Sequence, residues 1–447
     1  MPLVAGTILL ITYLIVPRRG WWFDQREVIN SFFINGAFFF VMLVRSAVQK
    51  PYSLELMHWM FCYFFFYFAP VIQFKIYYFP LQLEPGNAEI LQVNKLVLSW
   101  GICFYIGSIY AKYVKGIKGR VAYGIRDEVL KVFAIIATLI TIGMLAIAGR
   151  SLFNRIDGWG AFMKMGQSTA LLLVNGSRAF VTFNVIYNGV HYQQEKKGQL
   201  LLIYSLICLL ICCFPTGIAR FQAAAIYIGI MIFFFPQLRR GTKFTYLFIF
   251  ALIVLFPFMD AFRRQNFSDV NIIKAFSSVF QNMAYSYTEG HYDAFSIFTY
   301  MLRMLEKEGL YWGKLLLGAV FFFVPREIWP GKPEGTGNII MEAHNLNLSN
   351  VSAPLPVEAY INFGVIGMLL VGVLAGWIVK KLDGVYWQSE EKMNEKKEWS
   401  YLGFFYPVAL SLFFFFLRGD LMSTLSYALS FVVVGYIMFR YCGNFKK

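Results

Sequence analysis

The sequence predicts an all-α membrane protein, a polytopic bundle of about 12 transmembrane helices with one large extracytoplasmic loop. Three observations support this fold class. Of the 447 residues, 58% are hydrophobic and only 15% are charged, whereas a soluble domain usually carries about 25% charged residues. Apolar runs long enough to cross a bilayer recur along the chain. Basic residues gather in the short connections on one side of these runs.

The apolar runs predict the individual helices, with boundaries good to a few residues. The predicted spans are residues 2–16, 28–44, 54–79, 90–114, 129–148, 166–190, 199–214, 220–236, 244–259, 358–379, 401–417 and 421–439. The first run lacks a basic leader and is followed by Pro17, Arg18 and Arg19, so we interpret it as a retained span rather than a signal peptide.

The distribution of basic residues predicts the orientation. With the N-terminus in the cytoplasm, the basic connections Lys112–Arg126, Arg239–Lys243, Lys380–Lys397 and Arg440–Lys447 all face inward. Both termini are then cytoplasmic. The net charge of +15 follows from this pattern, so we expect no nucleic acid partner. The segment Lys380–Ser400 is predicted to be a solvated cytoplasmic connection.

Three regions follow from this topology: residues 1–259 with spans one to nine, residues 260–357 as the extracytoplasmic loop, and residues 358–447 with the last three spans and the tail. Inside the loop, apolar residues recur at helical spacing over Ile272–Met283 and Phe295–Leu305, which predicts amphipathic helices on the membrane surface. Leu315–Val324 is too short to span and is predicted to be re-entrant or interfacial.

Several arginines lie near outward span ends, where a charge is costly and often functional. Arg220 opens a helix in PTGIARFQAAAIY, so its guanidinium and the free backbone N–H groups could together bind phosphate. The complete set of candidate pyrophosphate-binding residues is Arg178, Arg220, Arg263, Arg264 and Arg418. The alternative interpretations are snorkelling, contact with lipid headgroups and simple topology signals.

Two histidines in the loop are candidates for chemistry. His344 can take a proton from a sugar hydroxyl and is the candidate catalytic residue. His291 lies beside Asp293 in TEGHYDAF, which suggests a polarised pair that contacts glycan. The alternative for His344 is a loop histidine with no catalytic role.

The segment VPREIWPGKP places two cations and one tryptophan between three prolines, which stiffen the backbone. Arg326, Trp329 and Lys332 are therefore candidates for binding glycan, with the indole stacking on a sugar face. The alternative is a rigid turn at the membrane interface.

Metal and cofactor sites are not predicted. The six cysteines show neither a disulfide framework nor metal-ligand spacing, and no P-loop, G-x-G-x-x-G or H-E-x-x-H motif occurs. Asp24 and Glu27 leave open a metal-dependent alternative.

Local motifs add a family resemblance. These are the turn Gly217–Arg220, the V-P-x-x-I-W-P-G-K-P run Val324–Pro333, the run Glu358–Gly367 and the L-R-G-D sequence Leu417–Asp420. With them, the chain resembles the Wzy-type polysaccharide polymerases of bacterial envelopes, such as O-antigen and enterobacterial common antigen polymerases. His344 and Asn345 also resemble the His-Asn of O-antigen ligases, although the gap to Glu358 is longer here.

The resemblance implies a GT-C-like membrane glycosyltransferase in the bacterial cytoplasmic membrane that needs no metal or other cofactor. Its substrate would be an undecaprenyl-pyrophosphate-linked oligosaccharide, bound through the arginines. Membrane lipids and a chain-length regulator protein would be further partners. Two alternatives stay open: an O-antigen ligase, and a flippase or transporter, for which Lys75, Lys95 and Arg178 are the candidate deep charges.

Overall fold

The computed structural model describes residues 25–111, 121–154, 160–165, 167–255, 258, 283–288, 290–346, 348, 351–396 and 399–444. In these residues eight helices are long and apolar enough to cross a membrane. They are Arg26–Gln49, Leu54–Ile76, Asn87–Tyr110, Asp127–Phe153, Ala170–Glu195, Leu355–Glu390, Tyr401–Arg418 and Leu421–Cys442. Three apolar helices are shorter: Gln199–Cys212, Arg220–Phe234 and Lys243–Leu255. The all-α membrane bundle is therefore confirmed, while the predicted span 2–16 lies outside the described residues.

The α-helices run in the following order: α2 (Arg26–Gln49), α3 (Leu54–Tyr63), α4 (Ala69–Ile76), α5 (Asn87–Tyr110), α6 (Asp127–Ala148), α8 (Gln167–Glu195), α9 (Gln199–Cys212), α10 (Arg220–Phe234), α11 (Lys243–Phe250), α14 (Met283–Ser286), α15 (Ala294–Glu308), α16 (Lys314–Val320), α17 (Thr336–Ala343), α18 (Leu355–Lys396), α19 (Tyr401–Arg418) and α20 (Leu421–Cys442). A π-helical turn, Phe64–Phe68, joins α3 to α4. Another, Ala251–Leu255, follows α11.

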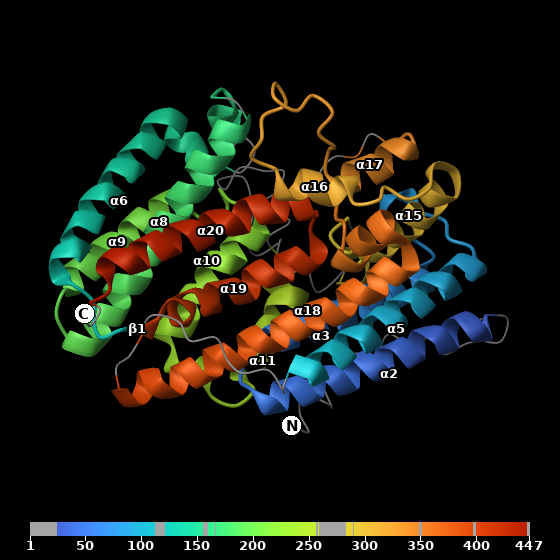
Figure 1. The fold of residues 1–447 in the computed structure, drawn as a ribbon, viewed down its shortest axis with the longest axis horizontal. Helices are drawn as coiled ribbons and strands as arrows, with labels where there is room; N and C mark the ends of the chain where they lie inside the picture. The colour runs from blue at the N-terminus through green and yellow to red at the C-terminus, as the bar shows by residue number, and fades with distance from the viewer. Residues whose placement is uncertain are drawn as a thin grey trace.

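Two hydrophobic cores divide the bundle. One is built mainly from α2, α3, α5, α15 and α18, and the other from α6, α8, α9, α10 and α20. Helix α19 lies between them (Figure 1). Its residues Tyr406, Leu410, Phe414 and Leu417 belong to the first core, whereas Phe404, Val408 and Leu412 belong to the second. These two sets fall on opposite faces of one helix because residues two apart differ by about 200°.

Helices α5 and α18 approach each other closely through glycines. A Cβ atom on Gly376 would overlap the carbonyl oxygen of Phe104, and one on Gly107 would overlap that of Val373. Gly372 and Gly376 are spaced as in the small-xxx-small pattern that lets membrane helices pack backbone to backbone. The absence of side chains at these positions is therefore what allows this contact.

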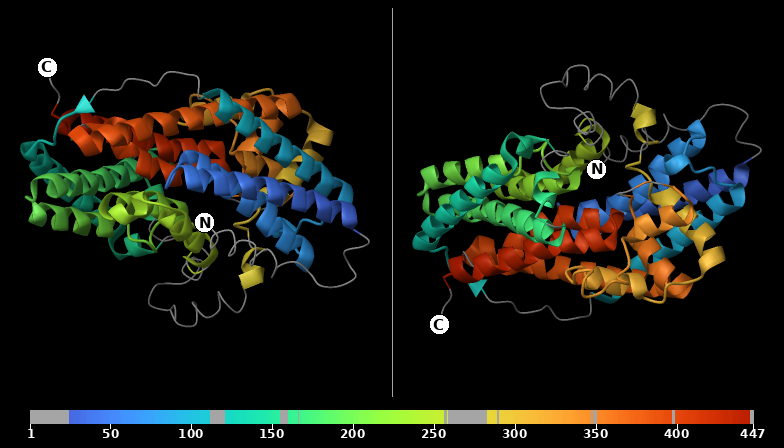
Figure 2. Two further views of the ribbon diagram at one scale, coloured as in Figure 1. Left: turned by 90° about the horizontal axis from the view of Figure 1, so that it is seen from below. Right: turned by 90° about the horizontal axis from the view of Figure 1, so that it is seen from above.

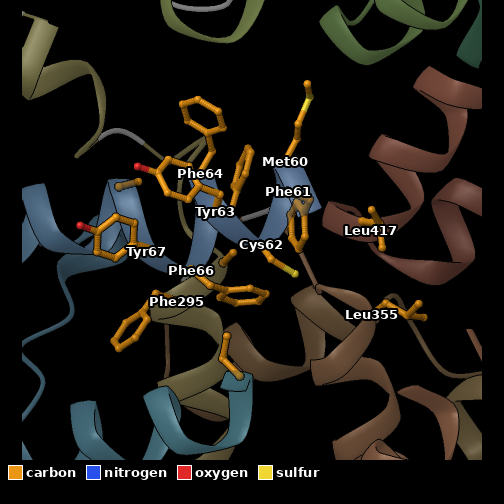
Figure 3. Close-up of a cluster of buried hydrophobic side chains, with 14 of the residues drawn as sticks. Met60, Phe61, Cys62, Tyr63, Phe64, Phe66, Tyr67, Phe295, Leu355 and Leu417 are labelled. Atoms are coloured by element: carbon orange, nitrogen blue, oxygen red, sulfur yellow. The ribbon is translucent and has the colours of Figure 1, made fainter. Parts of the chain in front are cut away.

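Helix α3 and its continuation to Ile76 form the most buried span, with 83% of its apolar window inside the protein. Its sequence is dominated by aromatic residues that point in several directions, as Figure 3 shows for Phe61, Tyr63, Phe64 and Phe66. A helix that is apolar on all sides is expected to lie inside a bundle. Neighbouring helices surround it, including α2, α18 and α19.

Helix α18 continues to Lys396, so the prediction of a solvated connection from Lys380 was wrong for its first half. Asp383, Tyr386 and Glu390 are buried there. The sequence from Lys381 to Lys396 contains no proline, so no proline stops the helix at the end of the apolar run. Near its start, Gly364 has φ of 66°, which kinks the helix at a conformation that favours glycine.

Helices α15, α16 and α17 lie together at one end of the bundle, beside the start of α18 (Figures 1 and 2). We call this end the lid end. A helix forms over the predicted Phe295–Leu305 segment, and Phe295 and Phe298 are fully buried. Phe295 packs against Phe32 and Phe79, so this apolar face contacts the protein bundle. The other predicted amphipathic segment, Ile272–Met283, lies almost wholly outside the described residues.

A small antiparallel sheet lies at the opposite end. Strands β1 (Val121–Ala122) and β2 (Trp399–Ser400) pair with Val121 opposite Ser400. The main chain of Tyr123 also binds that of Asn444, beyond the end of α20. The connection after α5 is thus tied to the C-terminal tail.

Candidate functional site

The site begins where the first turn of α10 meets the last turn of α19. The ring of Phe221 stacks on Phe415 with centroids 3.5 Å apart, and it meets Tyr427 of α20 edge-on at 5.4 Å. This aromatic contact holds the starts of α10 and α20 against the end of α19. Arg220, the first residue of α10, and Arg418, the last residue of α19, are therefore brought to the same place.

Both arginines contact His291, which lies in the loop just before α15. Nη2 of Arg220 lies 2.9 Å from Nδ1 of the His291 ring and also contacts Nε2. Nε of Arg418 donates to the His291 carbonyl oxygen at 2.8 Å. A guanidinium can only donate, so the ring nitrogen that faces Arg220 must carry a lone pair. This nitrogen is therefore a hydrogen-bond acceptor.

Asp293 extends this cluster into the loop that leads to α18. Its carboxylate lies 3.5 Å from Nη2 of Arg418, and it accepts hydrogen bonds from the hydroxyl of Ser352 at 2.6 Å and from the backbone N–H of Ser352 at 3.1 Å. Asp293 is only 1% exposed. The predicted link between His291 and Asp293 thus takes the form of a shared contact with Arg418.

Tyr292 lies between His291 and Asp293 in the sequence, and its pKa responds to the charges around it. Burial raises the pKa of Tyr292 above its usual value, and the positive charges of Arg220 and Arg418 oppose this shift. Its hydroxyl donates to the carbonyl oxygen of Leu252 at 3.1 Å. Both guanidinium groups are therefore close enough to act on one phenol.

Arg178 contacts another side of the same first turn of α10. Its Nη1 donates to Oε1 of Gln222 at 2.9 Å, and the residue is 5% exposed. Among the described residues nothing accepts from its Nε, and no described carboxylate pairs with it. Gln222 lies two residues after Arg220, about 200° further around the helix. The start of α10 thus has an arginine on each of two faces.

His344 lies apart from this arginine cluster. It ends α17, and its Nε2 lies 2.9 Å from the carbonyl oxygen of Tyr300, on the second turn of α15. Its ring packs against the Tyr300 ring at 4.7 Å. Tyr300 is seven residues after Asp293, which corresponds to about 10 Å along a helix. Of these two loop histidines, His291 is the one that we find in contact with the arginines.

The two cations of the proline-rich segment bind backbone carbonyl groups of the same segment and of the residues just before it. Nζ of Lys332 donates to the carbonyl oxygens of Phe322 and Val324, both at 2.8 Å, and Nη1 of Arg326 donates to the carbonyl oxygen of Lys332 at 2.9 Å. Burial lowers the pKa of Lys332, and the nearby Arg326 lowers it further. Lys332 is 9% exposed, whereas Arg326 is exposed and Trp329 is half-buried. Arg326 and Trp329 are thus the more accessible of the three predicted glycan-binding residues.

Buried carboxylates fasten this part of the loop to the bundle. Glu358 accepts from the Thr336 hydroxyl at 2.7 Å and from the backbone N–H of Leu421 at 2.9 Å. Asp420 caps α20 by accepting from the N–H of Ser423 at 3.0 Å. Its carboxylate also lies so close to Gly335 that a Cβ there would be 2.5 Å from Oδ2. Glu358 and Asp420 therefore connect α17, α18 and α20.

Some site residues were not predicted, and some predicted residues cannot be placed. Gln222, Ser352 and Asp420 had no assigned role, although Gln222 and Asp420 lie within motifs that contain Arg220 and Arg418. Arg263 and Arg264 lie outside the described residues. Within the ranges that the structure describes, no group of three His, Cys, Asp or Glu side chains is arranged to hold a metal ion.

The arrangement can bind an anion beside a histidine. Arg178 and Arg220 lie at the start of α10, where backbone N–H groups add positive potential, and Arg418 joins Arg220 at His291. Comparison of the chain with models of protein families, with curated proteins and with solved structures found no match.

Proposed function

We propose that this chain polymerises undecaprenyl-pyrophosphate-linked oligosaccharide repeat units into a surface polysaccharide. The reaction would take place on the outer face of a bacterial cytoplasmic membrane, in a GT-C-like bundle of about 12 spans with both termini cytoplasmic. The resemblance of the motifs to Wzy-type polymerases supplies the substrate class. The arginine cluster at the lid end supplies the chemical support.

The observation that carries the proposal is the burial of Arg178 with no described carboxylate beside it. An arginine inside a membrane bundle is costly unless an anion compensates it. A pyrophosphate bound at the start of α10 provides that anion, and Arg220 and Arg418 reach the same helix end from the loop side. Cations that neutralise a pyrophosphate make it a better leaving group.

In this proposal the acceptor is a sugar hydroxyl of a second carrier-linked unit. The bond between the anomeric carbon and the pyrophosphate oxygen breaks, and a bond from that carbon to the acceptor oxygen forms. Arg220 turns from the His291 ring to the pyrophosphate, which frees the lone pair of the ring nitrogen. The hydroxyl proton passes to this nitrogen, and undecaprenyl pyrophosphate leaves. His291 takes this role in place of His344 because its ring contacts Arg220.

The remaining candidates have supporting roles. Asp293 positions Arg418, since it is held by Ser352 and lies 3.5 Å from the guanidinium. Arg326 and Trp329 are on the accessible surface of the stiffened loop, which suits a growing glycan. A chain-length regulator protein and the surrounding lipids are the proposed further partners.

The test is complementation of a strain that lacks the gene. Without it, we expect surface lipid to carry single repeat units, and the wild-type chain should restore full-length polymers. Arg178→Gln, Arg220→Ala and Arg418→Ala should fail at normal protein levels, while the exposed Arg150→Ala should succeed. Full-length polymers in the deletion strain would reject the proposal. Polymers left on the lipid carrier would instead identify a ligase, and units held on the inner leaflet would identify a flippase.

A further inference from the structure

A cavity lined by polar residues lies at the end of the bundle opposite the lid end. It has a volume of about 220 Å³ and lies between the end of α2, the start of α3 and the second half of α18. Its lining residues are Ser46, Gln49, Lys50, Ser53, Glu55, Lys380, Asp383, Gly384, Trp387 and Gln388. Lys380 is 22 residues after Glu358 on α18, about 33 Å of helix, so this cavity is separate from the arginine cluster.

The carboxylates of this cavity already accept hydrogen bonds. Nζ of Lys380 donates to Oε2 of Glu55 at 2.6 Å. Asp383 accepts from the backbone N–H of Leu54 at 2.9 Å, from that of Glu55 at 3.1 Å, and from the hydroxyl of Tyr406. Asp383 thus faces the first turn of α3, where the helix dipole stabilises negative charge. Both carboxylates of the cavity therefore already have donors within the protein.

The donors of the cavity are in surplus. The hydroxyl of Ser46 and Nε1 of Trp387 are buried, and neither has a hydrogen-bond partner among the described residues. Nζ of Lys50 lies 4.9 Å from the centre of the Trp387 ring, and none of the ion pairs found in the described ranges involves Lys50. Buried polar groups are almost always satisfied, so the Ser46 hydroxyl and the Trp387 indole N–H require an acceptor that the described protein does not supply. The ammonium of Lys50, which is half-buried, can donate to the same acceptor.

We infer that this cavity binds the phosphate group of an anionic ligand. A phosphate oxygen accepts from ammonium, hydroxyl and indole donors, and a volume of about 220 Å³ exceeds what one phosphate needs. The cavity lies at the end of three spans and combines a lysine with a tryptophan, as basic headgroup sites between membrane helices do. Exposed apolar side chains of the same helices, Val48 and Ile378, provide a surface for acyl chains.

Two sources share this chemistry, an anionic phospholipid headgroup and a soluble phosphate. The experiment measures the thermal unfolding midpoint of the full-length protein, purified in neutral detergent. The added probes are short-chain phosphatidylglycerol, short-chain phosphatidylcholine or inorganic phosphate. We expect phosphatidylglycerol to raise the midpoint by several degrees. An equal rise with inorganic phosphate would identify the soluble source.

The variants connect the rise to the cavity. Lys50→Gln removes the cation, and Trp387→Phe removes only the indole N–H donor. Both variants should therefore lose the rise in the unfolding midpoint. Ser46→Ala, a small change that preserves the helix, should at least halve it. Lys75→Gln changes an exposed lysine at the other end of the α3–α4 span and should keep the full rise. The inference is overturned if no probe raises the midpoint, if phosphatidylcholine acts as strongly as phosphatidylglycerol, or if the three cavity variants respond like the wild type.

Discussion

Nη1 of Arg178 donates to Oε1 of Gln222 at 2.9 Å, so a buried guanidinium on α8 is held by a neutral amide on α10. An amide orients the arginine without cancelling its charge. This differs from Arg303, whose Nε and Nη2 donate to the Glu89 carboxylate at 2.5 and 2.8 Å. A bound anion would therefore interact more strongly with Arg178, whose charge is not compensated, than with Arg303, which already pairs with Glu89.

Replacing Arg178 should increase the stability of the protein and abolish its activity. Arg178→Met removes a buried charge that has no described counter-ion, so we expect the free energy of unfolding to rise by about 1 kcal/mol. Polymer formation should be lost. Thermal unfolding in detergent and the length of glycan chains in cells are the two measurements. Arg303→Met is the control, because it leaves Glu89 unpaired and should lower the unfolding midpoint. Normal glycan chains with Arg178→Met would contradict the role of Arg178.

The two loop histidines should differ in their effect on glycan transfer. We expect His291→Gln to slow chain elongation by about 10²-fold, since the proton acceptor is lost. His344→Gln should change the rate far less, because His344 contacts the Tyr300 carbonyl. Elongation by purified protein with a carrier-linked substrate is the measurement, with His191→Gln, at the other end of the bundle, as control. An equal loss with His344→Gln would return the proton acceptor role to that residue.

The contact between α5 and α18 should not tolerate a methyl group. Gly376→Ala places Cβ against the carbonyl oxygen of Phe104, which is backbone and cannot rotate away. We expect a loss of about 1–3 kcal/mol in the free energy of unfolding. Gly384→Ala is a matched control on the same helix, since a Cβ there meets no atom within 4 Å. If both variants unfold at the same temperature, close glycine packing does not limit the stability of this pair.

Asp420 should make stability depend on pH. Burial raises the pKa of Asp420, while the backbone N–H groups of Ser423 and of Thr336 and Gly337 partly oppose this shift. A carboxyl whose pKa is higher in the folded state than in the unfolded state favours folding while it is protonated. That contribution is complete below the unfolded pKa and is lost as the pH rises through the folded pKa.

The unfolding midpoint of the wild type should therefore fall as the pH is raised above the usual range of an aspartate. Asp420→Asn keeps a side-chain oxygen that can cap α20 but cannot ionise, so its midpoint should fall less over the same interval. The measurement is thermal unfolding from about pH 4, near the usual pKa of an aspartate in water, to about pH 8. Parallel curves for the two proteins would show that Asp420 does not titrate in this interval.

Much of the bundle was predictable because hydropathy reports which segments avoid water. Hydropathy located ten of the eleven apolar helices of the described residues to within a few residues. It failed for α18 because hydropathy shows where an apolar run ends, and the helix continues beyond that point. A helix continues until a cap or a breaker ends it. Lys380–Lys396 contains no proline, and its Gly384 is accommodated within the helix. Buried Tyr386 and half-buried Trp387 both contact Tyr52, and this tertiary packing extends α18.

The sequence predicted individual residues of the site but not the contacts between them. Arginines inside spans or at their ends stand out as single costly charges, which is why Arg178, Arg220 and Arg418 were recognised. That Arg220 meets His291 depends on contact between segments 71 residues apart, and hydropathy contains no information about which helices are neighbours. The same reason explains why Gln222 and Ser352 were missed, and why Lys332 was expected to face glycan when it is bound to two carbonyl groups.

The length of α10 has a consequence for the surrounding lipid. Its 15 residues extend about 22 Å, and the 14 residues of α9 about 21 Å, against a hydrocarbon thickness of about 30 Å. Ile203 and Ile207 of α9 are exposed, so a bilayer that these two helices cross would thin to match their hydrophobic length. Such thinning lowers the nearby headgroups toward Arg220. In the proposed function, a carrier lipid would then deliver its pyrophosphate sideways from the leaflet, and membranes of shorter acyl chains should favour this entry.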